Sequence, residues 1–308
     1  MPHHGRMKNP SLAGVVMAIS AAALWGTTGT AQTFASSLTS PYWIGALRLA
    51  VASAFFAGIV LLGKSGGPQS QFSFRAAWFW ILLGGVSIAA YNLCFFAGVK
   101  ATGVATGTGV AIGSGPVWIG LLQSLITRRP PRPLWWFGTA LAVSGISLML
   151  TGSSADARLD MAGLILCLAA GLAYACYTVV SKHFVGIATP EMATLSVFTT
   201  AAVIAIPVAA LASDSFAATS STWVMVGYLG VVATGISFLL FNYALRQVSA
   251  ATCVTLSLTE PVTAFVLAIF VVGEQPKVLA FCGLGLVVAG LLLVVWGETS
   301  HYRSAKKP

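Results

Sequence analysis

Charged residues are scarce in this sequence. Of 308 residues, 16 are Lys or Arg and 7 are Asp or Glu, together 7% of the chain. A soluble domain carries about a quarter charged residues, so these few cannot cover a water-exposed surface. That excludes a soluble globular enzyme and a disordered chain. The net charge of +9 includes no run long enough to follow a phosphate backbone, so we expect no nucleic-acid partner.

Cysteine offers neither a disulfide framework nor a metal site. The count is odd, each cysteine lies in an apolar stretch, and there is no CxxC motif or Cys/His pairing. We interpret them as small buried apolar residues and expect no metal or cofactor. The positions are Cys94, Cys167, Cys176, Cys253 and Cys282.

Long hydrophobic runs are abundant. Hydrophobic residues make up 57% of the chain, and a helix needs about 17–25 predominantly apolar residues to cross a bilayer. The runs are continuous, whereas the strands of a membrane barrel alternate apolar and polar residues. The sequence therefore predicts an all-α membrane protein with ten transmembrane helices. The predicted spans are 12–33, 42–62, 76–98, 102–126, 134–150, 161–181, 191–211, 222–245, 250–272 and 278–296.

The Lys and Arg residues predict the orientation of these spans. With the amino terminus in the cytoplasm, twelve of them fall inside, Arg48 falls within a span, and only Lys100, Arg158 and Lys277 fall outside. Cytoplasmic loops carry the excess of Lys and Arg. Both termini are then cytoplasmic, and the expected location is the bacterial cytoplasmic (inner) membrane.

The second half of the chain repeats the first. Five helices per half is an odd number, so the halves enter the membrane in opposite senses, an arrangement typical of transporters with a binding site near the midplane. The predicted organisation is a cytoplasmic tail (1–10), a first five-helix repeat (11–151), an external linker (152–160), a second repeat (161–297) and a cytoplasmic tail (298–308). The matched pairs are Ala13-Gly14 with Ala162-Gly163, Pro41 with Pro190, Trp78 with Trp223, Pro116 with Pro261, Gly138 with Gly283, and Gly145 with Gly290.

Several motifs resemble a known family. The stretch Ala23-Leu24-Trp25-Gly26 followed by Pro41 and Arg48 resembles the first two helices of EamA-type members of the drug/metabolite transporter superfamily. Glu260-Pro261, Gly273-Glu274 and the interval from Gly283 to Gly290 are similar to that family's second repeat. The resemblance covers 12–296 and is closest to the YddG-type aromatic amino acid exporters. One departure is Arg128-Arg129, which stands where the second half has Gly273-Glu274.

Two charged residues are predicted within the membrane. Glu260, about 15 Å into the ninth span, is the only acid at mid-depth, and such a residue marks a functional site by default. It binds a substrate amino group, exchanges a coupling proton, or forms a structural hydrogen bond. Arg48 lies about 9 Å inside the outer end of the second span. It meets a substrate carboxylate or Glu260, or its side chain extends to the interface.

Aromatic, amide and hydroxyl residues at membrane depth predict a central cavity. In lipid-facing positions the polar groups among them would lack partners, whereas a cavity supplies water and substrate. Such a lining suits a flat, largely apolar solute with a small polar head, such as an aromatic amino acid. Ordinary helix packing is the alternative. The predicted lining consists of Trp25, Tyr91, Asn92, Phe95, Ser114, Trp118, Tyr174, Tyr177, Phe238, Asn242, Thr255 and Ser257, together with Arg48 and Glu260.

Proline and glycine positions predict how the helices bend and pack. Pro116 and Pro261 fall near the middle of the fourth and ninth spans, where proline kinks a helix. They are interpreted as paired hinges, with static kinks as the alternative. Gly138 and Gly145 in the fifth span, and Gly283 and Gly290 in the tenth, each form one small-residue face. We expect these two helices to pack closely as scaffold.

The predicted function is a secondary transporter that exports amino acids (aromatic amino acids in first place) or related metabolites by alternating access. An exporter of other amphipathic metabolites or drugs is the alternative. A membrane-embedded enzyme is disfavoured because there is no mid-membrane His or second acid to form a catalytic pair, and a channel because there is no ring of charge. The expected partners are a small-molecule substrate and membrane lipid, and a monomer and a homo-oligomer are both compatible with the pattern.

Overall fold

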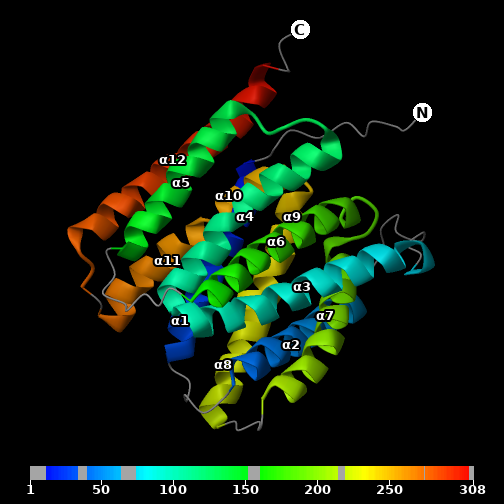
Figure 1. Cartoon of the computed structure of the whole chain (residues 1–308). Helices are drawn as coiled ribbons and strands as arrows, with labels where there is room; N and C mark the ends of the chain where they lie inside the picture. The colour runs from blue at the N-terminus through cyan, green and yellow to red at the C-terminus, as the bar shows by residue number, and fades with distance from the viewer. Residues whose placement is uncertain are drawn as a thin grey trace.

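The computed structural model describes residues 12–33, 40–63, 74–151, 160–213, 219–273 and 275–304, and every regular element in these ranges is helical. This confirms the all-α prediction for the described part of the chain. The predicted tail 1–10, most of the linker (152–159), Glu274 and residues 305–308 lie outside the described residues. The elements (Figure 1) are α1 (Leu12–Thr33), α2 (Pro41–Leu62), α3 (Phe74–Thr102), α4 (Val104–Thr127), α5 (Pro133–Thr151), α6 (Met161–Phe184), α7 (Pro190–Ala212), α8 (Ser220–Gly230), η1 (Val231–Ile236), α9 (Ser237–Leu245), α10 (Ala250–Leu256), α11 (Thr259–Leu267), η2 (Ala268–Val272) and α12 (Val278–Ser304).

Nine stretches of the described helices are long and apolar enough to cross a membrane. They identify the chain as an integral membrane protein. The fifth predicted span, 134–150, corresponds to α5, whose apolar part is the shorter stretch Pro133–Met149. At 1.5 Å per residue that part is about 25 Å long, less than the roughly 30 Å hydrocarbon core. The other nine are Leu12–Ala31, Pro41–Leu62, Ala77–Thr102, Gly107–Thr127, Met161–Phe184, Pro190–Ala212, Ser220–Leu245, Ala250–Val271 and Val278–Gly297.

The regular helix of the ninth span is interrupted at Ser257 and Leu258. Helix α10 ends at Leu256, and a tight turn follows in which the Leu258 N–H donates to the Thr255 carbonyl at 3.0 Å. Helix α11 then begins at Thr259, so Pro261 is its third residue. The first four N–H groups of a helix have no intrahelical acceptor, so proline costs no hydrogen bond there. Pro116, by contrast, is buried inside the continuous helix α4.

Helices α5 and α12 lie side by side along their length (Figure 1). A Cβ atom at Gly283 would lie 2.5 Å from the Gly145 carbonyl oxygen, and one at Gly290 would lie 2.5 Å from the Gly138 carbonyl oxygen. The backbones approach this closely only because all four residues are glycines. The predicted packing of the two glycine faces is confirmed.

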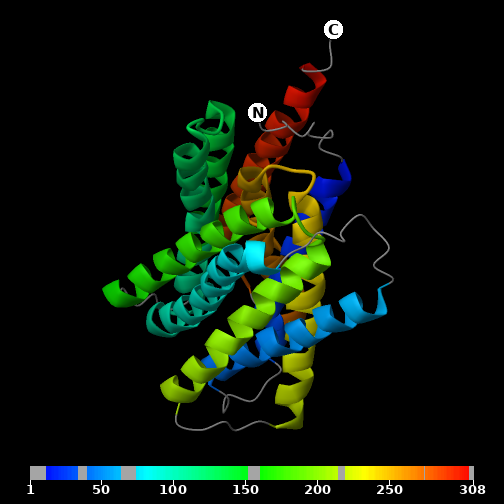
Figure 2. The ribbon, with the colours of Figure 1, turned by 90° about the vertical axis from the view of Figure 1, so that its right-hand side faces the viewer.

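The main core joins α1, α2, α3, α6, α7 and α9 through aromatic and small side chains. Phe56 of α2 packs on Phe198 of α7 with ring centroids 5.4 Å apart, and Phe198 packs on Phe238 of α9 at 4.8 Å. Figure 2 shows α7 and α2 crossing the span formed by α8, η1 and α9. This core includes Trp25, Tyr177 and Phe238, which the sequence predicts for the lining of the central cavity.

Candidate functional site

Arg48 is held inside the bundle. Its side chain is 8% exposed, and its Nε and Nη2 atoms donate to Asn92 Oδ1 on α3 at 3.1 and 2.7 Å. Asn92 Nδ2 in turn donates to the Ile88 carbonyl at 2.9 Å. The guanidinium carbon also lies 5.6 Å from the ring centre of Phe96. Arg48 therefore does not extend along the helix to the interface, which was one alternative, and Asn92 fixes the direction of its guanidinium group.

Glu260 lies in the first turn of α11, directly after the break. Arg48 and Tyr91 are near enough for their charges to act on Glu260, but no ion pair joins Arg48 to Glu260 among the described residues. No described side chain donates a hydrogen bond to its carboxyl group. The first turn of a helix also favours a carboxylate, because the partial charge of the helix is positive there. Arg48 is thus bound to Asn92, and the Glu260 carboxyl group receives no hydrogen bond from a described side chain. That the two residues share one binding site stays a prediction.

Gly26 brings α1 against this turn. A Cβ atom at Gly26 would lie 2.5 Å from the Glu260 carbonyl oxygen and 2.6 Å from Thr263 Cβ. Only a residue without a side chain permits that approach. The glycine of the motif Ala23-Leu24-Trp25-Gly26 is therefore required by the close packing of α1 on α11.

An aromatic cluster lies near Arg48 and Glu260, which are together called the charged pair below, although no ion pair joins them among the described residues. The ring centroid of Trp25 lies 6.0 Å from that of Tyr174 and 4.8 Å from that of Phe238. Tyr91 lies 5.9 Å from Tyr174 and is stacked on Phe95 at 5.7 Å. Five of the predicted cavity residues, carried by α1, α3, α6 and α9, are thus brought together.

Tyr174 connects the aromatic cluster to the break in the ninth span. Its hydroxyl lies 2.7 Å from Ser257 Oγ, and Ser257 Oγ also donates to the Cys253 carbonyl at 3.1 Å. Tyr174 interacts electrostatically with Tyr91 and Glu260. Aromatic rings, the hydroxyls of Tyr174 and Ser257, and the Glu260 carboxyl group therefore lie near the point where α10 ends and α11 begins.

Tyr177 and Asn242 form a separate buried pair. Asn242 Nδ2 donates to the Tyr177 hydroxyl and to the Phe238 carbonyl, both at 3.0 Å. The pair touches the cluster through Tyr177 and Phe238, whose ring centroids are 5.5 Å apart. Asn242 Oδ1 has no hydrogen-bond partner among the described residues.

Three other predicted cavity residues have local roles. Ser114 Oγ donates to the Ala111 carbonyl of its own helix at 3.1 Å. The hydroxyls of Thr255 and Thr139 lie 3.3 Å apart and join α10 to α5. Trp118 packs in a cluster with Trp135, Trp136, Tyr174 and neighbouring aliphatic residues. Among the described residues, no hydrogen bond joins any of these three side chains to Arg48 or Glu260.

Two features were missed by the sequence reasoning. Phe241 packs on Trp25 with ring centroids 5.3 Å apart, and its position three residues after Phe238 on one helix face was an available signal. At the end of the bundle where α1 begins, Tyr243 donates to the Glu191 carboxylate. Lys182 Nζ there donates to the Leu245 carbonyl and, at 2.8 Å, to the Val248 carbonyl. These bonds tie α6, α7 and α9 together, and no local pattern indicated them.

Metal chemistry has no counterpart in the described residues, where no group of three or more His, Cys, Asp or Glu side chains could hold an ion. The arrangement around Arg48 and Glu260 can bind a solute that carries charges of both signs and an apolar body. Such a site can recognise a solute without changing it.

The sequence of this chain is similar to those of known transporters. The model of the EamA-like transporter family matches residues 12–151 and again 161–296. A Bacillus subtilis (strain 168) protein named as the uncharacterized transporter YwfM is 35% identical over 274 residues, covering 89% of this chain and 90% of that protein. The threonine/homoserine exporter RhtA of Escherichia coli (strain K12) is 28% identical over 229 residues, covering 74% of this chain and 73% of RhtA.

A solved crystal structure has the same fold. It superposes with a TM-score of 0.78 and covers 96% of this chain and 99% of the other, at 20% sequence identity. At that identity the similarity concerns the arrangement of the helices alone.

Proposed function

Because this chain belongs to the EamA-like transporter family, we propose that it is a secondary transporter that exports amino acids by alternating access through a central site in the membrane. The family and the nine apolar spans establish a membrane transporter. We further propose the substrate class, the site residues, the alternating mechanism and the location in a bacterial inner membrane.

The single observation that carries the substrate class is the charged pair. Arg48 is directed by Asn92 and lies in the electrostatic reach of Glu260, whose carboxyl group receives no hydrogen bond from a described side chain. A free amino acid carries a carboxylate and an ammonium group on one carbon. A guanidinium group suits the first, since it binds carboxylates in a fork geometry, and the Glu260 carboxylate suits the second.

The aromatic cluster supports an apolar or aromatic side chain on the substrate. Trp25, Tyr91, Phe95 and Tyr174 present ring faces and edges beside the charged pair. Aromatic rings add about 0.5–1.5 kcal/mol per well-placed pair beyond simple burial. Aromatic amino acids are therefore the preferred candidate, while the printed function of RhtA makes threonine and homoserine the second.

The two matches of the family model support two structural repeats, 11–151 and 161–297, each with five helices when α5 is counted. By the Lys and Arg bias both termini are cytoplasmic, so the halves have opposite senses. In the ninth span, six residues of α10 are buried but none of α11. The bonds of Lys182 and Tyr243 hold the helices together at the opposite, cytoplasmic end of the bundle. The site therefore opens at the α11 end, which faces the outside of the cell.

The break after Leu256 and the proline in α4 serve as hinges in this proposal. A turn absorbs a change in backbone angles at little cost, whereas a continuous helix resists it. Pro116 leaves one carbonyl of α4 without its usual donor and permits bending. Movement at these two places exchanges access between the two faces.

Counterflow in proteoliposomes tests the substrate assignment. We expect labelled phenylalanine to exchange, with phenethylamine and phenylpropionate as weak competitors because each lacks one charged group. A charge-assisted hydrogen bond contributes about 1.5–3 kcal/mol, so each analogue should compete roughly 10- to 100-fold less well. Threonine and a lipophilic cation complete the panel. Stronger competition by the cation than by any amino acid would favour the alternative, a drug or metabolite exporter.

Variants of the charged pair sharpen this test. Arg48→Gln should remove the preference for phenylalanine over phenethylamine, and Glu260→Gln should remove the preference over phenylpropionate. Arg75→Gln, at an exposed position, is the matched control and should leave both preferences intact. If both site variants keep the full preference of the unmodified protein, the assignment of the pair to substrate is wrong.

A further inference from the structure

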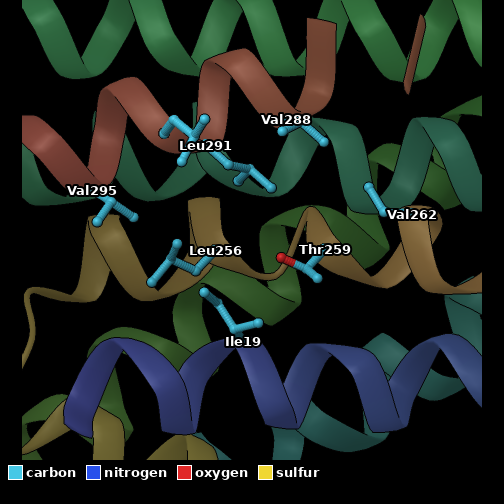
Figure 3. Close-up of a pocket in the computed structure, with 8 residues that line it drawn as sticks. Ile19, Leu256, Thr259, Val262, Val288, Leu291 and Val295 are labelled. Atoms are coloured by element: carbon cyan, nitrogen blue, oxygen red, sulfur yellow. The ribbon is translucent and has the colours of Figure 1, made fainter. Parts of the chain in front are cut away.

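A groove lies at the junction between α12 and the broken ninth span. Figure 3 shows side chains from α1, α10, α11 and α12 converging on it. Ile19 comes from α1, Leu256 from α10, Thr259 from α11 and Leu291 from α12. Seven of the eight lining residues are aliphatic, and the volume is about 210 Å³. Arg48, Glu260 and the aromatic cluster contribute nothing to its lining.

The groove opens toward the surroundings of the bundle. Val288 and Leu292 of α12 line it and are 42% and 64% exposed. Both lie within the membrane-crossing stretch Val278–Gly297. In a bilayer such exposed aliphatic side chains face hydrocarbon, so the mouth of the groove is in contact with lipid.

We propose that the acyl chain of a membrane phospholipid binds in this groove. The lining carries no charge, and its only polar side chain is that of Thr259. A polar solute would lose its hydrogen bonds to water there without replacement. The volume equals that of roughly seven water-sized groups, which suits a segment of methylene chain.

The position of the groove distinguishes it from ordinary lipid-facing surface. Leu256 precedes the break and Thr259 follows it, so one chain contacts both half-helices as well as α1 and α12. An unfilled space would forfeit the dispersion contacts of its lining. Apolar helices gain nothing from the hydrophobic effect within lipid, so such packing contacts decide how they associate. The bound chain therefore fills the space between α12 and the two half-helices.

The bound chain also lies next to the proposed substrate site. Thr259 directly precedes Glu260 in the first turn of α11. A chain in contact with Thr259 supports the turn that holds the carboxyl group. This consequence rests on the proposed function, whereas the lipid site itself does not.

Photolabelling tests the site. The full-length protein is reconstituted with a phosphatidylcholine that carries a diazirine in mid-chain, irradiated, digested and mapped by mass spectrometry. We expect label to concentrate on the segments around Ile19, Leu256 and Leu291. Label spread evenly over the exposed residues of all spans, such as Val203 of α7, which is 65% exposed, would overturn the proposal.

Two groove-filling variants and a matched control make the result specific. Val262→Phe places a ring in the groove and should lower labelling of the other lining segments severalfold. If Val262→Phe does not fold, Leu292→Trp is the second variant. It narrows the mouth of the groove from an exposed position and should also lower labelling of the other lining segments. Val203→Phe adds the same ring elsewhere and should leave the pattern unchanged. Labelling of the groove that persists in a folded filling variant refutes the proposal, while groove-specific labelling in a protein that transports no amino acid refutes only the proposed function.

Discussion

Replacement of Gly26 by alanine tests the contact between α1 and the first turn of α11. The new Cβ atom would lie 2.5 Å from the Glu260 carbonyl oxygen and 2.6 Å from Thr263 Cβ. Non-bonded carbon atoms are comfortable at about 3.5–4.0 Å, so one of the two segments must move by about 1 Å. The atoms in the way belong to the backbone and to a Cβ, so no side-chain rotation relieves the contact.

The expected cost follows from that displacement. Overpacking of this kind destabilises a protein by about 1–3 kcal/mol, and the better helix propensity of alanine returns at most about 1 kcal/mol. The displaced turn also carries Glu260. An error of about 1 Å in the position of a functional group can lower a rate up to roughly 100-fold. Gly26→Ala should therefore lower counterflow more strongly than it lowers thermal stability.

Gly29→Ala is the control on the same helix. A Cβ atom there has no neighbour within 4 Å, so the substitution tests alanine in α1 without the clash. Both variants are purified, and their melting temperature and phenylalanine counterflow are compared with those of the unmodified protein. If Gly26→Ala and Gly29→Ala behave alike in both measurements, the contact of α1 with the Glu260 turn does not limit either property.

Two further predictions concern packing and the tied end of the bundle. Gly283→Ala places a Cβ 2.5 Å from the Gly145 carbonyl oxygen and should lower the melting temperature by the equivalent of about 1–3 kcal/mol. Gly285→Ala, where a Cβ has no neighbour within 4 Å, is the control and should leave the melting temperature unchanged. Equal melting temperatures of the two variants would contradict the close packing of α5 and α12. Tyr243→Phe removes the hydroxyl that donates to the Glu191 carboxylate and should lower the free energy of unfolding by about 1–3 kcal/mol. Thermal unfolding should detect this loss. An unchanged melting temperature would show that this bond contributes nothing to stability.

Features that repeat along the chain were predictable from the sequence. Hydropathy is a property of consecutive residues, so the membrane-crossing stretches and the all-helical class were recognisable without any tertiary contact. The glycine faces of α5 and α12 were predictable for a similar reason, since a seven-residue spacing places Gly283 and Gly290 on one side of a helix. Motifs such as Ala23-Leu24-Trp25-Gly26 also carried the family resemblance that the EamA-like match bears out.

The break in the ninth span was only partly visible. Pro261 marked an interruption, but the predicted outcome was a kink near the middle of a continuous helix. Proline is compatible with both a kink and the first turn of a new helix. The turn at Ser257 and Leu258 lies where Pro261 lacks the N–H that would bond to the Ser257 carbonyl. The hydrogen bond between Ser257 Oγ and the Tyr174 hydroxyl joins residues more than eighty positions apart, so no local pattern indicates it.

The sequence by itself determined that this chain forms apolar membrane-spanning helices and that the few polar groups within them are the candidate site residues. Only the tertiary structure decided which of those groups meet. These helices are apolar around most of their circumference, so the sequence does not indicate which face turns inward. The bond from Arg48 to Asn92 spans 44 positions. The grouping of Trp25, Tyr91 and Tyr174 likewise follows from how the helices are rotated against one another.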